Sequence, residues 1–284
     1  MQEIARAKLN LSLRVLGRRA DGYHELESLV VFAQLGDTLT VMPAGDLRLS
    51  LTGPFASQLA AENDNLVLRA AYALQAVSVG SQGAHLMLEK NLPIASGMGG
   101  GSADAAAALR ALRALWNVEI SDAELHSIAL KLGADVPVCL QSRPAIMRGI
   151  GERIVPLAGL PSFWMVLINP GVGISTADIF RRLDARTFTG EDGDATPTLG
   201  GLEELLAWLK DNPNDLQAPA ISLAPVIGHV LQALQSAGSC RLARMSGAGA
   251  TCFGLFAGEK DAANAAQRLS SDHPDWWIKI SGCG

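Results

Sequence analysis

The sequence predicts an α+β chain of two domains, and three observations support that prediction. Residues 8–51 carry strand patterns, with alternation at 8–15, 38–41 and 47–51 and an apolar stretch at 29–35. After a glycine-rich segment at residues 97–101, the apolar residues recur at helical spacing. Near the middle, Pro156, Gly159 and Pro161 interrupt the chain before a half that mixes strand and helix patterns. We therefore expect one domain over residues 1–155 and a second over residues 156–284.

The opening segment is expected to be rich in strands. Apolar and polar residues alternate along it, with Leu9, Leu11, Leu13 and Val15 on one face and Lys8, Asn10, Ser12 and Arg14 on the other. Lys8 and Asn10 should therefore point the same way. A turn is predicted at residues 19–22, then an apolar stretch at 29–35, a second turn at Gly36-Asp37, and strands around 38–41 and 47–51.

Helix signals follow. A helical pattern runs from Asp64-Asn65 through Ala76, and a strand is expected at residues 84–88. Ser102 is expected to cap a helix that runs to Trp116. A capping box, Ser121 and Glu124, opens the next helix, which should end at Gly133.

In the second half of the sequence, the residue pattern predicts an apolar strand at residues 163–168 and a surface loop at 184–201. It also predicts helices at 202–210 and 224–237 and a strand at 252–256.

Composition excludes several classes of protein. The chain has 284 residues and a formal net charge of −5, without a dense Lys/Arg block, which argues against a general nucleic-acid binder. The longest apolar run, residues 163–168, is far below the roughly 20 residues that span a bilayer. The first residues lack the apolar core of a signal peptide, so we expect a cytoplasmic protein without membrane contact. The four cysteines lie far apart and are expected to be free thiols.

The strongest chemical signal is a glycine loop that opens a helix. The chain has 29 glycines, against about 20 from average usage, and four of them fall within residues 97–101. Backbone N–H groups in such a loop can surround an anion, and the helix dipole favours phosphate. The alternative is a plain turn between strand and helix. Walker A requires a Lys before its Ser or Thr, where this chain has Gly101, and the dinucleotide fingerprint also fails.

Weaker signals stand elsewhere. A second small-residue loop, residues 245–251, is either a tight turn or a ligand loop. Lys8 is either a solvated edge charge or a reactive group, and Asp135 either a cap or a catalytic carboxylate. Tyr23 and His24 follow a turn-forming Asp21-Gly22 pair. The histidines show no metal-ligand spacing.

Taken together, these residues resemble the GHMP kinase superfamily. The segments that carry the resemblance occur in order and cover residues 7 to about 256: residues 7–11, 17–26, 93–105, 133–137, 174–177, 214–215 and 246–250. The segments at 17–26 and 133–137 resemble the branch that phosphorylates 4-diphosphocytidyl-2-C-methyl-D-erythritol on its 2-hydroxyl with ATP, in the non-mevalonate route to isoprenoid precursors. The resemblance implies an N-terminal α/β domain similar to ribosomal S5 domain 2, and a C-terminal ferredoxin-like α+β domain.

The resemblance also implies the site. Asp135 would act as general base on the acceptor hydroxyl, with Lys8 holding both groups. ATP with Mg²⁺ would be bound by residues 93–102 and by an adenine pocket, through Asn65, Leu66, Val67, Lys90, Pro93, Ser96, Gly97, Met98, Gly99, Gly100, Gly101 and Ser102. No dedicated metal ligand is expected, apart from the Ser102 hydroxyl. The substrate would be held by Asn10, Tyr23, His24, Thr176, Phe180, Gly247 and Gly249.

Two departures from the family pattern are visible, Ala103 in place of a Ser and Ala248 in place of a Thr. Two other functions stay open at this point. One is a GHMP kinase for another small alcohol such as homoserine or mevalonate, and the other is a non-catalytic nucleotide- or RNA-binding module. As partners we expect the small substrate and no nucleic acid or membrane, with the chain a monomer or homodimer.

Overall fold

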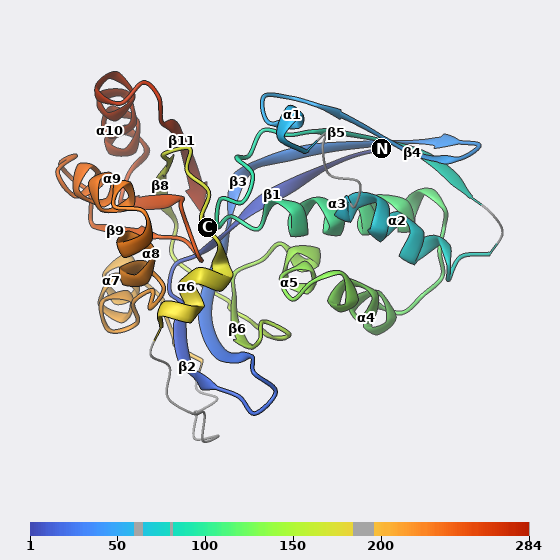
Figure 1. The fold of residues 1–284 in the computed structure, drawn as a ribbon, viewed down its shortest axis with the longest axis horizontal. Coiled ribbons are helices and arrows are strands. Elements are labelled where there is room, and N and C mark those ends of the chain that lie inside the picture. Colours follow the sequence, from blue (N-terminus) through green and yellow to red (C-terminus); the bar gives the residue numbers. More distant parts are fainter. Residues whose placement is uncertain (60–64, 80–81, 184–195, 284) are drawn as a thin grey trace. The chain divides into compact units, whose positions relative to one another are not determined.

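The computed structural model describes residues 1–59, 65–79, 82–183 and 196–283, which fold into two compact units (Figure 1). The first unit comprises residues 1–8, 35–94 and 99–142, and the second comprises residues 9–34, 95–98 and 143–284. The long strand β3 (His24–Ala44) supplies its first half to the second unit and its second half to the first.

The first unit combines strands with a group of helices. Its strands are β1 (Gln2–Asn10, up to residue 8), the second half of β3, β4 (Leu47–Thr52) and β5 (Gly83–Glu89). β5 runs antiparallel to β3 and parallel to β4. Its helices are α1 (Ala56–Leu59), α2 (Leu66–Gln75), α3 (Gly100–Leu115), α4 (Asp122–Leu132) and α5 (Val136–Gln141). Figure 1 shows α2 to α5 grouped together, with α3 packed against both α2 and α5.

The second unit contains two groups of antiparallel strands. The first half of β3 pairs with β2 (Arg14–Arg18) and β6 (Ala145–Gly149), and β6 pairs with β7 (Arg153–Pro156). The other group is a four-stranded sheet in the order β11-β8-β10-β9, with bounds Trp277–Cys283, Phe163–Asn169, Cys252–Phe256 and Leu242–Met245. The helices of this unit are α6 (Thr176–Arg182), α7 (Leu202–Asp211), α8 (Gln217–Leu223), α9 (Val226–Gln235) and α10 (Glu259–Asp272).

The core of the second unit lies between the four-stranded sheet and its helices. Val166 and Ile168 from β8 are fully buried in one apolar cluster with Leu234 of α9 and Leu269 of α10. An antiparallel sheet covered by helices agrees with the α+β class predicted from the second half of the sequence.

Most of the predicted elements are present within a residue or two of their expected ends. Asn65 caps α2 by accepting a hydrogen bond from the N–H of Val67, and Ser121 with Glu124 forms the capping box of α4. The strands around 84–88, 163–168 and 252–256 and the helices around 202–210 and 224–237 are also confirmed. The four cysteines are free thiols.

The turn predicted at Gly36-Asp37 is wrong, because β3 continues through both residues. A Cβ at Gly36 would lie 2.1 Å from the carbonyl oxygen of Ala5, so this glycine permits the close approach of β1 and β3. The Asp37 side chain is buried and accepts hydrogen bonds from the N–H groups of Asn91 and Leu92.

The capping role predicted for Ser102 is also wrong. α3 begins two residues earlier, with Gly99 at the N-cap in the left-handed region (φ 61°) and the N–H of Ala103 bonded to its carbonyl. The first strand likewise differs from the expected alternation, since it starts at Gln2 and breaks after Asn10. Leu13 pairs instead with the segment at residues 213–215, because its N–H and C=O bond to Pro213 and Asp215.

Most of the surface loop predicted at residues 184–201 lies outside the described residues, and residues 196–201 contain neither helix nor strand. The boundary expected near Pro156 stays a prediction. Within the part of the chain that the structure describes, no helix has the length and apolar character needed to cross a membrane.

Candidate active site

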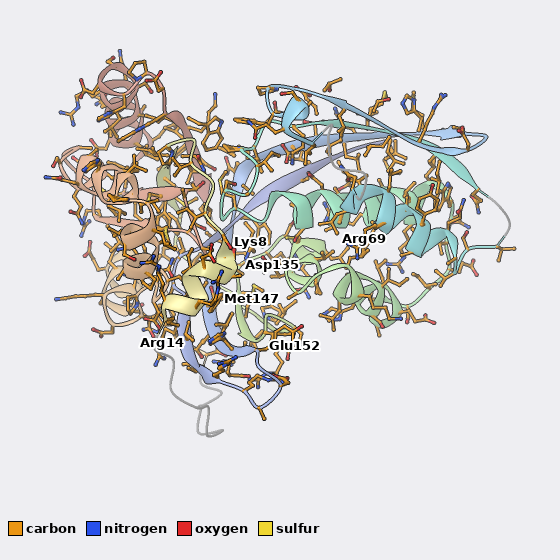
Figure 2. All side chains as sticks on the ribbon, viewed as in Figure 1. Lys8, Arg14, Arg69, Asp135, Met147 and Glu152 are labelled. Atoms are coloured by element: carbon orange, nitrogen blue, oxygen red, sulfur yellow. The ribbon has the colours of Figure 1, made fainter. Side chains whose placement is uncertain are left out.

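Lys8 and Asp135 form an ion pair in the first unit. The Nζ atom of Lys8 lies 3.0 Å from Oδ2 of Asp135, and Figure 2 shows the two residues side by side. The Lys8 side chain is 4% exposed, whereas that of Asp135 is 39% exposed. A buried ammonium therefore faces a carboxylate that remains open to solvent or to a ligand.

Local sequence explains why the Asp135 carboxylate can turn toward Lys8. α4 ends at Leu132 with Gly133 as its C-cap, and α5 begins at Val136 with a proline in its first turn, which leaves Asp135 at the N-cap. An N-cap aspartate usually accepts a hydrogen bond from its own helix. Asp135 makes no such side-chain bond. The capping interpretation considered for this residue is therefore not what the geometry supports.

The start of the glycine loop's helix lies against Lys8. A Cβ placed on Gly99 would lie 3.1 Å from Cε of Lys8, so the lysine stem runs past this glycine at close range. Gly100, Gly101 and Ser102 follow as the first residues of α3. Their N–H groups have no partner within the helix, which is the arrangement that binds anions at helix N-termini. The structure thus brings together the predicted catalytic residues Lys8 and Asp135 and the helical part of the predicted phosphate loop.

The other part of that loop, in the second unit, is tied to the second small-residue loop. The hydroxyl of Ser246 donates to the carbonyl of Gly97 at 2.9 Å, and the N–H of Thr251 donates to the carbonyl of Ser96 at 3.1 Å. A Cβ on Gly97 would lie 2.4 Å from the Ser246 carbonyl oxygen. The segment 245–251 is therefore the direct support of residues 96 and 97. Met98 and Pro93 are buried.

Asn10 lies beside the same support. Its side-chain amide donates to the Ser28 hydroxyl at 2.7 Å, and its backbone N–H donates to Oγ of Ser246 at 3.0 Å. A Cβ on Gly247 would lie 3.2 Å from Oδ1 of Asn10, which explains a glycine there. Asn10, Gly97, Ser246 and Gly247 thus meet in the second unit. Gly249 has a positive φ of 84° and packs against Met245.

His24 and Phe180 are stacked. Their ring centroids lie 4.6 Å apart with an interplanar angle of 23°. Burial, followed by the nearby Arg18 charge, lowers the pKa of His24 below its usual value. Thr176 is exposed one helical turn before Phe180 on α6, and the Tyr23 side chain next to His24 is 61% exposed. The predicted cytidine-binding residues His24 and Phe180 are therefore in direct contact, although 156 positions separate them in the sequence.

The residues predicted for the adenine pocket lie at the start of α2. Asn65 is the cap, Val67 is buried, and Leu66 reaches the start of α3, since a Cβ on Gly101 would lie 3.4 Å from its Cδ1. This places Leu66 next to the helical part of the glycine loop.

Lys90, which was predicted to bind the nucleotide, is buried below the protein surface. Its side chain is 2% exposed and its ammonium contacts the carboxylates of Asp37 and Asp104. The sequence predicted a turn at Asp37 and no functional role for Asp37, Asp104 or Ser246. One sequence signal could have indicated a buried charge at both acids. Asp37 lies within the mostly apolar residues 29–41, and Asp104 lies among alanines.

Comparisons with known proteins show the family of the chain. The model of the GHMP kinases N terminal domain matches residues 65–143, and that of the GHMP kinases C terminal domain matches residues 195–275. A 4-diphosphocytidyl-2-C-methyl-D-erythritol kinase of Parvibaculum lavamentivorans is 58% identical over 99% of this chain and 98% of its own. The chain belongs to the GHMP kinases.

Further similar proteins were found by sequence and by structure. A kinase of the same name from Cereibacter sphaeroides is 52% identical, with 98% of this chain and 97% of that protein covered. The crystal structure of a 4-(cytidine 5'-diphospho)-2C-methyl-D-erythritol kinase has a TM-score of 0.80 and 36% identity, and covers 100% of this chain and 99% of that one. A homoserine kinase from Cytophaga hutchinsonii shares the fold at a TM-score of 0.68 and 18% identity, covering 100% of this chain and 94% of its own. This GHMP kinase is thus a small-molecule kinase that uses ATP.

Proposed function

We propose that this GHMP kinase transfers the γ-phosphoryl group of ATP to the 2-hydroxyl of 4-diphosphocytidyl-2-C-methyl-D-erythritol, giving the 2-phosphate and ADP. The reaction belongs to the non-mevalonate route to isoprenoid precursors. Relatives that are 58% and 52% identical over nearly their whole length carry the name of that kinase. The observation that carries the proposal is the Lys8–Asp135 pair beside Gly99, at the start of an anion-binding helix.

In this proposal Asp135 accepts the proton of the substrate hydroxyl. The hydroxyl oxygen forms a bond to the γ-phosphorus while the bond from that phosphorus to the β,γ-bridging oxygen breaks, and ADP leaves. The half-open Asp135 carboxylate can meet a hydroxyl, and the buried Lys8 ammonium holds it in place and offsets negative charge. Because phosphoryl transfer has a loose transition state, positioning and charge neutralisation contribute more than the strength of the base.

The triphosphate of ATP would be bound by residues 96–102, through backbone N–H groups and the end of the α3 dipole. The adenine would be bound near Asn65, Leu66 and Val67, because Leu66 lies next to Gly101.

Mg²⁺ fits this site through the phosphates rather than through a protein cage. Among the described residues, no group of three or more His, Cys, Asp or Glu side chains is placed to hold a metal ion. Magnesium in kinases keeps several waters and is bound mainly by substrate phosphates with one or two protein oxygens. The Ser102 hydroxyl, in the first turn of α3, is the candidate protein oxygen. When bound, the ion neutralises charge on the phosphates.

The cytidine would be bound at Tyr23, His24 and Phe180. The lowered pKa keeps His24 neutral at physiological pH, so its ring can both donate and accept a hydrogen bond to a base edge. The exposed Tyr23 ring offers a stacking face. Asn10, Thr176, Gly247 and Gly249 would contact the rest of the substrate. As cellular setting we propose the cytoplasm, a monomer or homodimer, and no nucleic-acid or membrane partner.

The test measures ADP release by the full chain with ATP, Mg²⁺ and one acceptor at a time. Turnover is expected with 4-diphosphocytidyl-2-C-methyl-D-erythritol and not with homoserine or mevalonate. Lys8→Ala and Asp135→Asn should abolish most of it, whereas Glu203→Gln, which breaks an exposed ion pair with Arg241, should not. Turnover of homoserine or mevalonate alone would refute the proposed substrate. ATP binding without any turnover would refute the proposed kinase activity.

A further inference from the structure

Three charged side chains are buried together in the first unit. The ammonium of Lys90 contacts Oδ2 of Asp37 and lies 2.6 Å from Oδ2 of Asp104, and the side chains are 2%, 0% and 3% exposed. Oδ1 of Asp37 accepts hydrogen bonds from the N–H groups of Asn91 at 2.6 Å and Leu92 at 2.9 Å. This charged network joins β3, the segment after β5, and α3.

The Asp104 carboxyl is not fully satisfied. Its Oδ1 atom is buried without a hydrogen-bond partner among the described residues. A buried ionised carboxylate with an unpaired oxygen is costly. Two carboxylates and one ammonium also sum to −1 if both acids are ionised, whereas one proton makes the network neutral. Burial is the largest cause that raises the pKa of Asp104, to about 8, and the Lys90 charge opposes it.

Lys90 and Asp37 are the charged groups that act on Asp104. Cys139 of α5 interacts electrostatically with the Asp104 carboxylate. Its thiol stays neutral, because burial raises the pKa of the thiol to about 12. From β1, the stem of the buried Lys8 lies against Gly99 at the start of α3, and its ammonium pairs with Asp135. On α2, α4 and β5 the buried side chains are apolar: Val67, Ala70, Ala71 and Leu74 on α2, Leu125 and Ala129 on α4, and Ala84, Leu86 and Leu88 on β5. The proton that neutralises the network therefore belongs on Asp104.

The charged groups of Asp37 and Lys90 lie close to the first residue of α3. A Cβ placed on Gly100, the first residue of this helix, would lie 3.7 Å from both Oδ2 of Asp37 and Nζ of Lys90. A helix N-terminus favours an anion through its N–H groups and dipole. A net negative charge buried beneath those N–H groups would oppose the anion, and at low dielectric it would do so strongly.

We propose that Asp37, Lys90 and Asp104 position the phosphate-binding end of α3, and that the network binds nucleotide in its neutral form with one proton on Asp104. Triphosphate binding above neutral pH then takes up a proton from solvent onto Asp104. Lys90 acts in this network as a positioning residue rather than as a phosphate ligand. The inference rests on the proposed function in one respect, that the α3 end of the glycine loop binds the phosphates of ATP.

The experiment measures MgATP binding to the full chain by calorimetry at pH 7 and pH 9, without an acceptor, in buffers of different ionisation enthalpy. With the Asp104 pKa near 8 in the free protein, the affinity should fall about tenfold between the two pH values. At pH 9, close to one proton should be taken up per ATP bound. Asp104→Asn keeps the shape of the side chain and fixes its neutrality, so its affinity should change less than about twofold over this range.

The matched control is Asp122→Asn, which removes a 94% exposed carboxylate paired with Arg113 in the same unit and should keep the wild-type pH dependence. Wild-type affinity that is equal at pH 7 and pH 9, without proton uptake, would overturn the network's role and leave the phosphate site standing. The same pH dependence in Asp104→Asn as in wild type would overturn it too. If Asp104→Asn does not fold, the wild-type proton count decides alone. Failure of MgATP to bind at pH 7 would instead count against the proposed function.

Discussion

The Nζ atom of Lys8 lies 3.0 Å from Oδ2 of Asp135, and the two partners differ tenfold in exposure. The ammonium is held inside the first unit, while the carboxylate keeps an open side. Since a buried ion pair is weak evidence for stability, we expect the value of this pair to lie in fixing the carboxylate for the proposed chemistry. The two residues should therefore act as one unit in kinetics.

A double-mutant cycle tests that unit. We expect Lys8→Met and Asp135→Asn each to lower kcat by about 10²- to 10³-fold, because each removes a positioned charge or proton acceptor. The double variant should lose at most about tenfold more than the worse single variant, because either change already disables the pair. Steady-state ADP release provides the rates. Losses that simply multiply would show that the residues act separately, and Arg113→Gln at an exposed pair is the control.

Two glycines with the same φ angle allow the cost of backbone strain to be measured apart from the cost of a steric clash. Gly97 and Gly159 both have φ 76°, but a Cβ on Gly97 would lie 2.4 Å from the Ser246 carbonyl oxygen, whereas one on Gly159 would meet nothing within 4 Å. Gly159→Ala should cost about 1–2 kcal/mol through the left-handed backbone alone. Gly97→Ala should cost a further ~1–3 kcal/mol for the overlap and raise the KM for ATP. Urea unfolding gives both free energies, and equal losses would contradict the close contact.

The stacked His24 should titrate below its usual pKa of 6.5, because burial and the Arg18 charge disfavour its cation. The folded state then binds this proton less readily than the unfolded chain. The resulting contribution to stability is present above about pH 6.5 and is lost as the pH falls. NMR titration of the ring protons measures the pKa. Phe180→Ala should move it back toward 6.5, Arg18→Gln should do so to a smaller extent, and Tyr23→Ala should leave it in place. A wild-type value at or above 6.5 would contradict the prediction.

What the sequence predicted depends on neighbours along the chain. Asn65 and the Ser121–Glu124 box form caps because the donors they bind lie two or three residues away. Lys8 and Asn10 both belong to β1, because the alternation that predicts a strand is a local pattern. Glycine density at residues 97–101 similarly marked the start of α3, although the helix began at Gly100 rather than after Ser102.

What the sequence could not predict depends on distant partners. Gly36-Asp37 has the composition of a turn, but Ala5 requires a glycine there, and Lys90, 53 residues away from Asp37, bonds to the carboxylate. In the same way, Ser246 bonds to Gly97 across 149 residues. Local propensity contains no information about either contact, so tertiary pairing decided both.

Ser246 provides the sharpest test of how the two small-residue loops are joined. Its hydroxyl is fully buried, donates to the Gly97 carbonyl and accepts from the Asn10 N–H. Ser246→Ala leaves two backbone groups without these bonds, so we expect a loss of about 2–4 kcal/mol in the free energy of unfolding. Ser271→Ala removes an exposed hydroxyl that donates to the Gln267 carbonyl one turn earlier in α10, and it should cost less than about 0.5 kcal/mol. Because Gly97 belongs to the predicted phosphate loop, Ser246→Ala should also raise the KM for ATP more than it lowers kcat. A variant as stable as Ser271→Ala, with an unchanged KM for ATP, would show that these bonds do not hold the loop.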